Sequence, residues 1–388
     1  MRARKRTEKF RTENTEGRGN GVARTIAFPN GVWERGEGPL TAMSALTNLI
    51  AGPLRLFGKR SAGDGTPRIL VIRRNRMGDM IYTLPLLHAL RRHYPQAHLA
   101  VACDPAGAPI ARACDAVNEV IVLQKSWVPG LAVLKNAAQL QGFDWVIAAK
   151  GGFDRRLATL SRLTNATLRI GFARNQNNAS SYTDPVALPE NPFDEHQIET
   201  LLRLLKPLGV MTVNKFAVDL SLTVPEAARA FAAPILAKPA LYRFMLINLS
   251  STARLKFRQR DFVALALKVL EATDLSVAFV AAPADQAKAA EMAAQMKSDR
   301  VVAVATPGPM ELAALLEKAV CLFTPEGGAA HLAASVEAPA VVLWSEGPFK
   351  KWHSRAANHV FVQAEPGEKN VPLERVWAAL GPLLPGKK

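Results

Sequence analysis

The sequence predicts an α/β protein with two doubly wound domains, and three observations carry this prediction. From residue 68 onward, short apolar runs of strand length alternate with segments of helical spacing. The alternation restarts after Pro225–Pro239, an Ala- and Pro-rich stretch that we interpret as the interdomain hinge. The chain has 388 residues, 49% of them hydrophobic, which is enough for two domains that each bury a core. Such regular alternation is typical of parallel sheets covered by helices on both faces.

Composition narrows the expected partners. The formal net charge of +16 favours anionic partners such as nucleotide diphosphates, nucleic acid or an acidic membrane surface. The basic residues near the start lack interleaved aromatic side chains, so we expect no nucleic-acid partner. The cysteines, Cys103, Cys114 and Cys321, are scattered, so they predict neither a metal site nor a disulfide framework and fit a reducing cytoplasm. No apolar run is long enough to span a bilayer.

Residues 1–67 are expected to be a basic, mostly disordered leader. They are rich in Arg, Lys, Glu, Gly and Asn, and they lack periodicity until about Leu40. No apolar core follows the first basic residues, so a secretory signal is not predicted. Within the leader, Leu40–Phe57 places apolar residues near one helical face and is followed by basic residues. Three interpretations stay open for it: a helix on an anionic membrane, a helix packed on the domain, or no stable helix because of Gly52-Pro53.

The first domain is expected at residues 68–237. It opens with a buried strand, Ile69–Ile72, a basic turn, and an amphipathic helix whose apolar residues run from Ile81 to Leu90. The further expected elements alternate in chain order: strand His98–Cys103, helix Ala106–Ala113, strand Glu119–Leu123, helix Ala132–Leu140, strand Trp145–Ala149, helix Leu157–Leu163, strand Leu168–Ile170 and helix Asp194–Leu208.

The second domain is expected at residues 238–388. Its expected elements again alternate: strand Phe244–Leu249, helix Phe262–Ala272, strand Val277–Ala281, helix Gln286–Met296, strand Val301–Val304, helix Met310–Lys318, strand Val320–Phe323, helix Ala329–Val336 and strand Ala340–Trp344. The last helix, Leu373–Leu384, is expected to pack back against the first domain.

Asp79 lies where chemistry is expected, just beyond the carboxyl end of the first strand. Ligands of open parallel sheets bind in that place. A second interpretation is an Asp that starts a helix, stabilised by free N–H groups and the helix dipole. Arg73, Arg74 and Arg76 precede it, and they either receive an acidic acceptor or remain solvated charges.

A second basic loop, Lys150–Arg156 with the sequence KGGFDRR, directly follows another strand. Lys150 and this loop either contact an anionic acceptor or form a solvated connection. In the second domain, Thr324–Ala334 reads TPEGGAAHLAA and lies between a buried strand and a helix of small residues. Its glycines, Gly327 and Gly328, allow a ligand to approach the backbone, and free N–H groups at the helix start suit a diphosphate.

Together these segments resemble the bacterial heptosyltransferase family, glycosyltransferase family 9. The first carries the pattern R-x-x-x-x-GD-x-x-x-TLP, which runs from Arg73 to Pro85 and contains Asp79. The second resembles a family pattern of an acidic residue, a small residue and Gly, then two residues before His-Leu-Ala-Ala. Gly328 and His331 match it, whereas Glu326 stands where the family has Asp and Gly327 where it has a hydroxyl residue. These departures change one carboxylate geometry and remove one hydroxyl contact to phosphate, and they leave the implied fold unchanged.

The segment Asn248–Phe262 resembles the family's loop after the first strand of the second domain. Lys256 matches the lysine that meets the donor phosphates in relatives. Leu249-Ser250-Ser251 replaces the usual Pro-Gly-Ala, and the hydroxyl groups of Ser250, Ser251 and Thr252 are candidate donors to phosphate. The basic residues of this loop form either a cationic wall or a solvated cluster: Arg254, Lys256, Arg258 and Arg260.

The resemblance covers Arg68–Ala378 and implies the GT-B arrangement, in which two Rossmann-like domains face a central cleft. It implies an inverting glycosyltransferase that moves heptose from ADP-heptose to a lipopolysaccharide core or related anionic, lipid-linked glycan. No catalytic metal or other cofactor is implied. The expected location is the cytoplasm, either free or held peripherally at the inner membrane.

The resemblance also implies roles for single residues. Asp79 is the expected general base, which removes the proton of the attacking hydroxyl. Lys256 and the helix start at Gly327-Gly328 are expected to stabilise the leaving diphosphate. Glu326 either orients the donor or holds its loop through backbone N–H groups. His331 either contacts phosphate or fixes the turn.

Two other functions stay open beside this one. The chain is either a transferase of another nucleotide sugar or a non-catalytic nucleotide- or glycan-binding relative, and the presence of Asp79 counts against the latter. A Rossmann oxidoreductase is disfavoured, because neither half has G-x-G-x-x-G followed by an acidic residue at the required distance.

Overall fold

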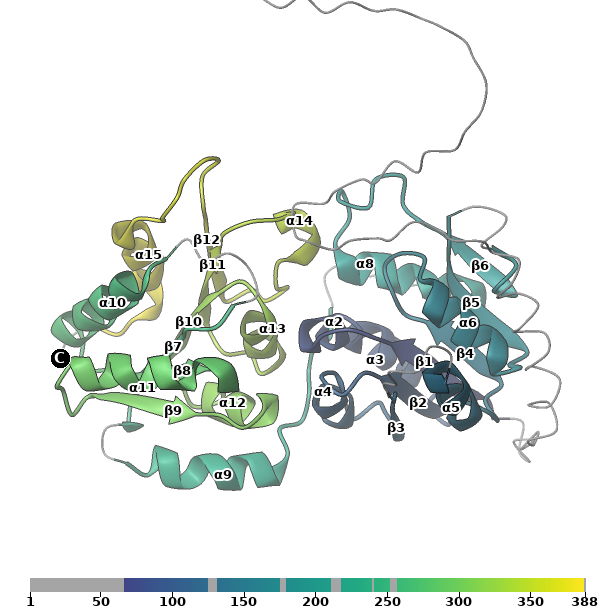
Figure 1. The fold of residues 1–388 in the computed structure, drawn as a ribbon, viewed down its shortest axis with the longest axis horizontal. Coiled ribbons are helices and arrows are strands. Elements are labelled where there is room, and N and C mark those ends of the chain that lie inside the picture. The colour runs from purple at the N-terminus through teal and green to yellow at the C-terminus, as the bar shows by residue number, and fades with distance from the viewer. Residues whose placement is uncertain are drawn as a thin grey trace, which may run out of the picture.

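The structure, a computed structural model, describes residues 66–124, 131–174, 179–210, 218–238, 241–251 and 257–386. These residues form two halves, each built on one six-stranded sheet (Figure 1). We call them the N-terminal half and the C-terminal half. The expectations for residues 1–65, including Leu40–Phe57, lie outside the described residues, as do those for Thr252 and Lys256.

The sheet of the N-terminal half has the strand order β3-β2-β1-β4-β5-β6, and all its strands are parallel. Its central strand, β1, is buried on both faces because Ile69–Ile72 are 0% exposed, as a continuous apolar run predicts. The strands are β1 (Arg68–Arg73), β2 (His98–Cys103), β3 (Glu119–Val122), β4 (Trp145–Ala148), β5 (Leu168–Ala173) and β6 (Asp184–Ala187). The helices are α2 (Met77–Ile81), α3 (Leu84–His93), α4 (Ala108–Arg112), α5 (Leu131–Gln139), α6 (Arg155–Leu163) and α8 (Gln197–Leu202), followed by the 3₁₀ helix η1 (Arg203–Leu208).

Two helices of this half differ from their predictions. The helix expected from Ile81 to Leu90 is divided into α2 and α3, because Pro85 has no N–H to continue the ladder. The long helix expected at Asp194–Leu208 is the short α8 and then η1, which contains Pro207. Gly209, at φ 69°, ends η1 in the left-handed conformation.

The sheet of the C-terminal half repeats the same topology, with the order β12-β11-β10-β7-β8-β9, again all parallel. The strands are β7 (Phe244–Asn248), β8 (Ser276–Ala281), β9 (Val301–Ala305), β10 (Cys321–Pro325), β11 (Ala340–Trp344) and β12 (His359–Gln363). The helices are α10 (Gln259–Ala272), α11 (Gln286–Gln295), α12 (Pro309–Leu316), α13 (Gly328–Ser335), α14 (Phe349–Trp352) and α15 (Leu373–Leu380), with 3₁₀ turns at Pro283–Asp285 and Gly381–Leu383. The predicted pair of doubly wound sheets is therefore confirmed.

The segment interpreted as the hinge contains α9 (Glu226–Leu236), which packs against α12 of the C-terminal half. Figure 1 shows α9 beneath that half. Ala228 and Ala232 of α9 are buried there, and Arg229 forms an ion pair with Glu317 over 2.8 Å.

The expected docking of the last helix on the first domain is wrong. Helix α15 packs on α10, β11 and β12 of its own half. Its apolar residues Val376 and Leu380 are 0% exposed in that core, and Lys268 of α10 reaches Glu374 over 2.6 Å. The apolar face of α15 is therefore already covered by its own half.

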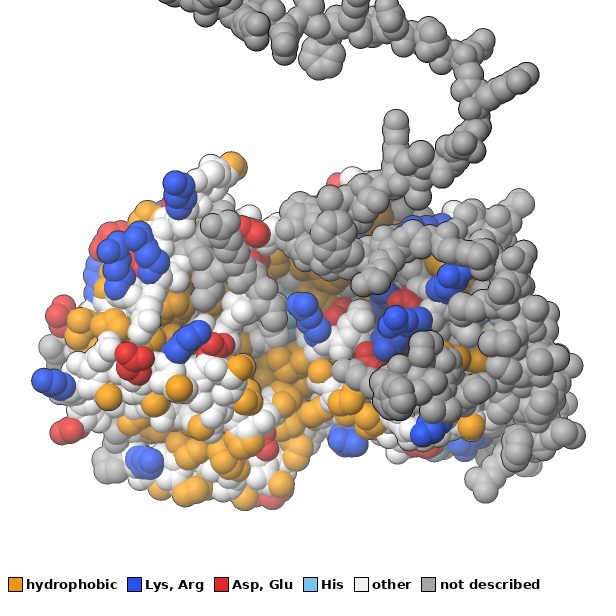
Figure 2. Space-filling view, viewed as in Figure 1, with side chains coloured by type: hydrophobic (Ala, Val, Ile, Leu, Met, Phe, Trp, Pro, Cys, Tyr) orange, Lys and Arg blue, Asp and Glu red, His pale blue; other side chains and the backbone are white. Residues whose placement is uncertain are grey.

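The two halves share an apolar contact. One buried cluster runs through both of them and includes Met80 and Ile110 as well as Ala313 and Ala333. On the face seen in Figure 2, apolar side chains gather along the seam between the halves. Among the described residues, no helix has the length and apolar character needed to cross a membrane.

Candidate functional site

The first part of the candidate site lies where the strand order of the N-terminal half reverses, between β1 and β4. In open parallel sheets, ligands bind outside the carboxyl ends of the strands at such a reversal of strand order. Arg73 is the last residue of β1, and Ala149 directly follows β4. The Nη1 atom of Arg73 donates to the carbonyl of Ala149 over 2.6 Å, so one side chain links the two strand ends.

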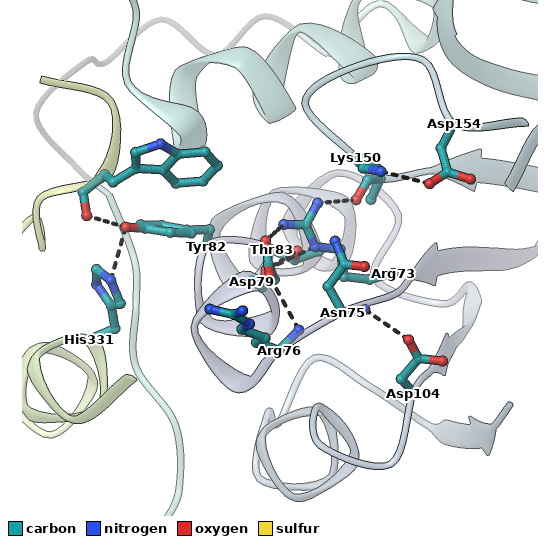
Figure 3. A network of polar contacts seen from close by, with 12 residues as sticks. Arg73, Asn75, Arg76, Asp79, Tyr82, Thr83, Asp104, Lys150, Asp154 and His331 are labelled. Atoms are coloured by element: carbon teal, nitrogen blue, oxygen red, sulfur yellow. Dashed lines mark hydrogen bonds and ion pairs between the residues drawn. The ribbon is translucent and has the colours of Figure 1, made fainter. Parts of the chain in front are cut away.

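The carboxylate of Asp79 is held by that same arginine (Figure 3). Arg73 Nη2 donates to Asp79 Oδ1 over 2.5 Å, and its Nε donates to the backbone carbonyl of Asp79 over 3.0 Å. The other carboxylate oxygen, Oδ2, accepts the backbone N–H of Arg76 over 3.2 Å. Asp79 therefore stabilises the first turn of α2 as its third residue, in line with one interpretation, while 20% of its side chain stays exposed. Each carboxylate oxygen has two acceptor positions, so Oδ2 keeps capacity for a further donor.

The three arginines of the turn are not equivalent. Arg73 is 2% exposed and its donors are engaged within the domain, so it holds Asp79 rather than receiving an acceptor, contrary to one of our expectations. Burial lowers the pKa of its guanidinium, although Asp79 acts in the opposite direction. Arg74 pairs with Asp104 over 3.4 Å, and Arg76 is exposed. Asn75, between them, has φ 94°, a strained conformation that such functional loops often contain.

Lys150 reaches the same region from the loop after β4. Its Nζ lies 2.6 Å from Oδ2 of Asp154, whose Oδ1 caps α6 by accepting N–H groups of Arg156 and Leu157. Burial raises the pKa of Asp154, but Lys150 and these N–H donors more than offset it, so the net shift is downward. The structure thus brings Lys150 near Asp79 through the link of Arg73 to Ala149 (Figure 3).

The second part of the candidate site lies at the matching reversal of the C-terminal half, between β7 and β10. Asn248 is the last residue of β7, and its Nδ2 donates to Thr324 Oγ1 of β10 over 2.9 Å. Ser250 does not point to an open space: its hydroxyl bonds to Asp285 over 2.9 Å and accepts the N–H of Ala282 over 2.9 Å. Ser251 donates to the carbonyl of Glu326 over 3.0 Å, which joins the loops after β7 and β10.

Glu326 holds its loop through backbone N–H groups, which is one of the two roles expected for it. It is 8% exposed, and its Oε1 accepts N–H groups of Ser345 over 3.3 Å and Glu346 over 3.1 Å. Gly327 follows at φ 145° and ψ −163°, a conformation that is essentially restricted to glycine. Helix α13 begins at Gly328, so its first N–H groups open at this reversal point.

The two sequence signatures are in direct contact. A methyl group added at Gly78, beside Asp79, would lie 3.1 Å from Cδ2 of His331 on α13. One added at Gly328 would lie 2.3 Å from the terminal carbon of Met77. Glycine at both positions therefore lets α2 and α13 approach closely across the boundary between the halves, as their neighbouring places in Figure 1 show.

His331 contacts the N-terminal half rather than an open surface. Its Nε2 lies 2.9 Å from the hydroxyl of Tyr82, and the side chain is 8% exposed. Burial lowers its pKa to about 3, so the ring is neutral at physiological pH. This environment fits the role of fixing the turn better than contact with phosphate.

Sequence reasoning missed the residues that join the halves. Tyr82 follows α2 and is 4% exposed, and His196 at the start of α8 is 2% exposed. The break that Pro85 makes in the first helix places Tyr82 at a helix end, but it does not indicate a partner in the other half. Among the described residues, no group of three or more His, Cys, Asp or Glu side chains is placed to hold a metal ion.

A family comparison supports the resemblance seen in the sequence. The family model described as glycosyltransferase family 9 (heptosyltransferase) matches residues 133–374, which is more than half of the chain. The comparison with curated proteins gives no match.

Solved structures give the fold independently. A glycosyltransferase of family 9 from Veillonella parvula is 18% identical at a TM-score of 0.72, with 82% of this chain and 97% of that chain covered. The E. coli ADP-heptose lipopolysaccharide heptosyltransferase II is 18% identical at a TM-score of 0.67, with 81% and 98% covered. The E. coli heptosyltransferase WaaC, solved with ADP, is 19% identical at a TM-score of 0.67, with 81% and 99% covered. The fold is therefore GT-B.

Proposed function

The chain belongs to glycosyltransferase family 9, and from that premise we propose that it transfers heptose from ADP-heptose to an anionic, lipid-linked glycan with inversion of the sugar carbon. In this proposal the N-terminal half receives the acceptor and the C-terminal half receives the donor. The E. coli WaaC structures with ADP and with ADP-2-deoxy-2-fluoro heptose support ADP-heptose as the donor. The lipopolysaccharide core is the acceptor that the heptosyltransferase II comparison supports.

One observation carries the proposal: a positioned carboxylate lies on a helix that touches the helix start of the other half. Arg73 holds Asp79 at the reversal point of one sheet, and α13 begins at the reversal point of the other. Helices α2 and α13 are in contact, so a general base and a cradle for phosphate would face a single reaction centre. Displacement with inversion needs this arrangement, because the hydroxyl attacks opposite the departing diphosphate.

In the proposed reaction an acceptor hydroxyl attacks the anomeric carbon of the heptose. Its proton passes to the Oδ2 atom of Asp79, while the bond from the carbon to the diphosphate oxygen breaks and leaves its electron pair on ADP. General bases of this kind contribute roughly 10²- to 10⁴-fold to a rate. The ion pair with Arg73 keeps the carboxylate from rotating away from the hydroxyl.

The charge that develops on ADP would be stabilised by the N–H groups at the start of α13 and by Lys256. We assign Glu326 to its loop rather than to the donor, since its Oε1 accepts two backbone N–H groups of the next loop. On the acceptor side, Arg76 and Lys150 would meet anionic groups of the glycan. We propose that these protein groups replace a catalytic metal, so that transfer should persist in EDTA. A cytoplasmic location fits the free cysteines, Cys103, Cys114 and Cys321, which are buried.

The test combines binding and turnover. Calorimetric titration with ADP, GDP, UDP and dTDP should give selective binding of ADP, retained in Asp79→Asn and weakened in Lys256→Ala. Transfer from ADP-heptose to a Kdo-containing lipid acceptor should be lost in Asp79→Asn. Selective binding of another nucleotide would show that the donor is a different nucleotide sugar, and the proposal of a transferase would stand. A folded protein that binds none of the four would favour a non-catalytic glycan-binding relative.

A further inference from the structure

Tyr82 ends the short helix that carries Asp79. It is the C-cap residue of α2, and α3 begins two residues later at Leu84 because Pro85 breaks the helical ladder. The break turns the Tyr82 side chain out of its own half and toward α13, as Figure 3 shows. The side chain is nevertheless 4% exposed, because residues of the C-terminal half cover it.

The hydroxyl of Tyr82 makes two hydrogen bonds, both to the C-terminal half. One partner is Nε2 of His331 at 2.9 Å, and the other is the backbone carbonyl of Trp352. A carbonyl only accepts, so the single hydroxyl proton of Tyr82 goes to Trp352. Nε2 of His331 must then carry a proton and donate to the Tyr82 oxygen. The result is a directed chain from α13 through Tyr82 to the end of α14.

A second tie lies beside the first. His196 caps α8 through Nδ1, which accepts the N–H of Ile198 over 3.2 Å. Its Nε2 lies 2.8 Å from the carbonyl of His353, and therefore donates to it. The consecutive carbonyls of Trp352 and His353 thus each accept a hydrogen bond from the N-terminal half. The N-terminal half therefore binds this turn of the C-terminal half at two consecutive carbonyl groups.

These contacts bear on Asp79, which precedes Tyr82 by three residues in the sequence, about one helical turn. At its start, α2 touches α13 through Met77 and Gly78, and at its end Tyr82 bonds to α13 and α14. Both ends of α2 therefore contact the C-terminal half. No comparable hydroxyl among the described residues bridges the halves at α2.

We propose that Tyr82 is a positioning residue for sugar transfer, a role that rests on the function proposed above. Its hydroxyl fixes helix α2, and with it the carboxylate of Asp79, at a set position relative to the donor-binding half. It does not touch the reacting atoms. Removing the hydroxyl keeps the ion pair of Arg73 with Asp79 but releases α2 from its bonds to His331 and Trp352.

The test is Tyr82→Phe, with Tyr94→Phe as a matched control. Tyr94 also donates its hydroxyl to a backbone carbonyl, that of Leu208 over 3.1 Å, but both partners lie in the N-terminal half. We expect Tyr82→Phe to lower kcat roughly tenfold to hundredfold, because small misplacements of reacting groups cost rates of that order. The Kd for ADP should stay within about twofold, since the donor is proposed to bind the C-terminal half alone. Tyr94→Phe should leave kcat near the wild-type value at a similar Tm.

A second measurement follows the distance between the two halves directly and does not depend on sugar transfer. Spin labels at Gln139→Cys on α5 and Lys288→Cys on α11, both exposed positions, measure the distance between the halves. The native cysteines are buried, so labelling is confined to the new sites. Tyr82→Phe should broaden or shift this distance distribution, whereas Tyr94→Phe should not.

The outcomes separate the two proposals. An unchanged kcat and an unchanged distance distribution in Tyr82→Phe would overturn the positioning role. So would a fall in kcat that Tyr94→Phe reproduces, because it would reflect general destabilisation. A wild-type protein that binds ADP but transfers no sugar would overturn the proposed function, and the label distances would still show whether Tyr82 ties the halves together.

Discussion

The two halves of the molecule use the same strand order but place different chemistry at the same topological point. In each half, the residue that ends the first strand reaches across to the fourth strand. In the N-terminal half this residue is Arg73, which bonds to Ala149 and to the carboxylate of Asp79. In the C-terminal half it is Asn248, which bonds to Thr324 without any ionised partner.

This difference teaches that the sheet decides where a site can form and the side chains decide what it can do. A guanidinium can hold a carboxylate ready to take a proton. A neutral amide closes the same gap without adding a negative charge where a diphosphate is proposed to bind. The remaining carboxylate there, Glu326, turns Oε1 to the N–H groups of Ser345 and Glu346.

The largest effect is expected when the negative charge at the strand reversal of the N-terminal half is removed. Asp79→Asn should lower kcat by roughly 10³-fold, because an amide cannot take the proton of the hydroxyl. Affinity for ADP should not change, since the donor is assigned to the other half. Steady-state kinetics and calorimetry measure the two quantities. Equal turnover by the variant would remove Asp79 from the chemistry.

Arg73 and Asn248, which each link the first and fourth strands of their half, can be compared directly in unfolding experiments. Arg73→Ala leaves a mostly buried carboxylate without its partner, so it should lower the free energy of unfolding by about 3 kcal/mol. Asn248→Ala removes only neutral hydrogen bonds and should cost about 1–2 kcal/mol. Denaturant titration of both variants measures the difference. Equal losses would contradict the distinction between a charged link and a neutral one.

The next test concerns the backbone of Gly327, at the strand reversal of the C-terminal half. Gly327→Ala places a side chain at φ 145°, which should cost about 1–3 kcal/mol and distort the start of α13. We therefore expect the Kd for ADP to rise about tenfold, a change of about 1.4 kcal/mol. Gly381→Ala is the control, because that glycine has φ −46° and no neighbour within 4 Å of an added methyl group. If both variants bind ADP like the wild type, the helix start is not the phosphate cradle.

The smallest expected effect concerns the boundary between the halves. Burial lowers the pKa of His196 to about 4, against about 6.5 in an unfolded chain. The unfolded state therefore takes up protons first, so the contribution of neutral His196 is complete above about pH 6.5 and is lost as the pH falls toward 4. At pH 5 this loss should be on the order of 1–2 kcal/mol.

Replacing His196 with Asn keeps an N-cap residue and removes the titration. Urea unfolding at pH 7.5 and pH 5 should therefore show a smaller difference between the two pH values for His196→Asn than for the wild type. His331, His353 and His359 have pKa values lowered in the same direction and remain in both proteins, so the difference between the proteins reports the replacement of His196. An identical difference in both proteins would show that His196 contributes nothing to the pH dependence.

The elements that sequence reasoning found are those whose apolar pattern is continuous. The central strands β1, β4, β7 and β10 were predicted because both of their faces are buried. The edge strands β6 and β12 were missed. β6 reads DPVA, with a proline that only an edge strand accepts, and β12 mixes polar with apolar residues.

Candidate site residues were predictable where one motif contains the contact, and not where the partner is distant in the chain. Asp79 and its turn lie within one stretch, so spacing and resemblance singled them out. The burial of Arg73 was not predictable, because its partner Ala149 is 76 residues away. Tyr82 bonds to a residue 249 positions later, and no local pattern records that pairing.

The contact between the two signatures limits how such proteins can exchange their parts. Gly78 leaves room for His331, and Gly328 leaves room for Met77, so each signature is sterically matched to the other. A chimera that joins the N-terminal half of one relative to the C-terminal half of another would keep this fit only where the residues that pack against the glycines are also compatible. We expect such chimeras to fold best when Met77 and Tyr82 are kept together with their partners Gly328 and His331. The halves share one strand order, but at this contact their side chains fit as a pair.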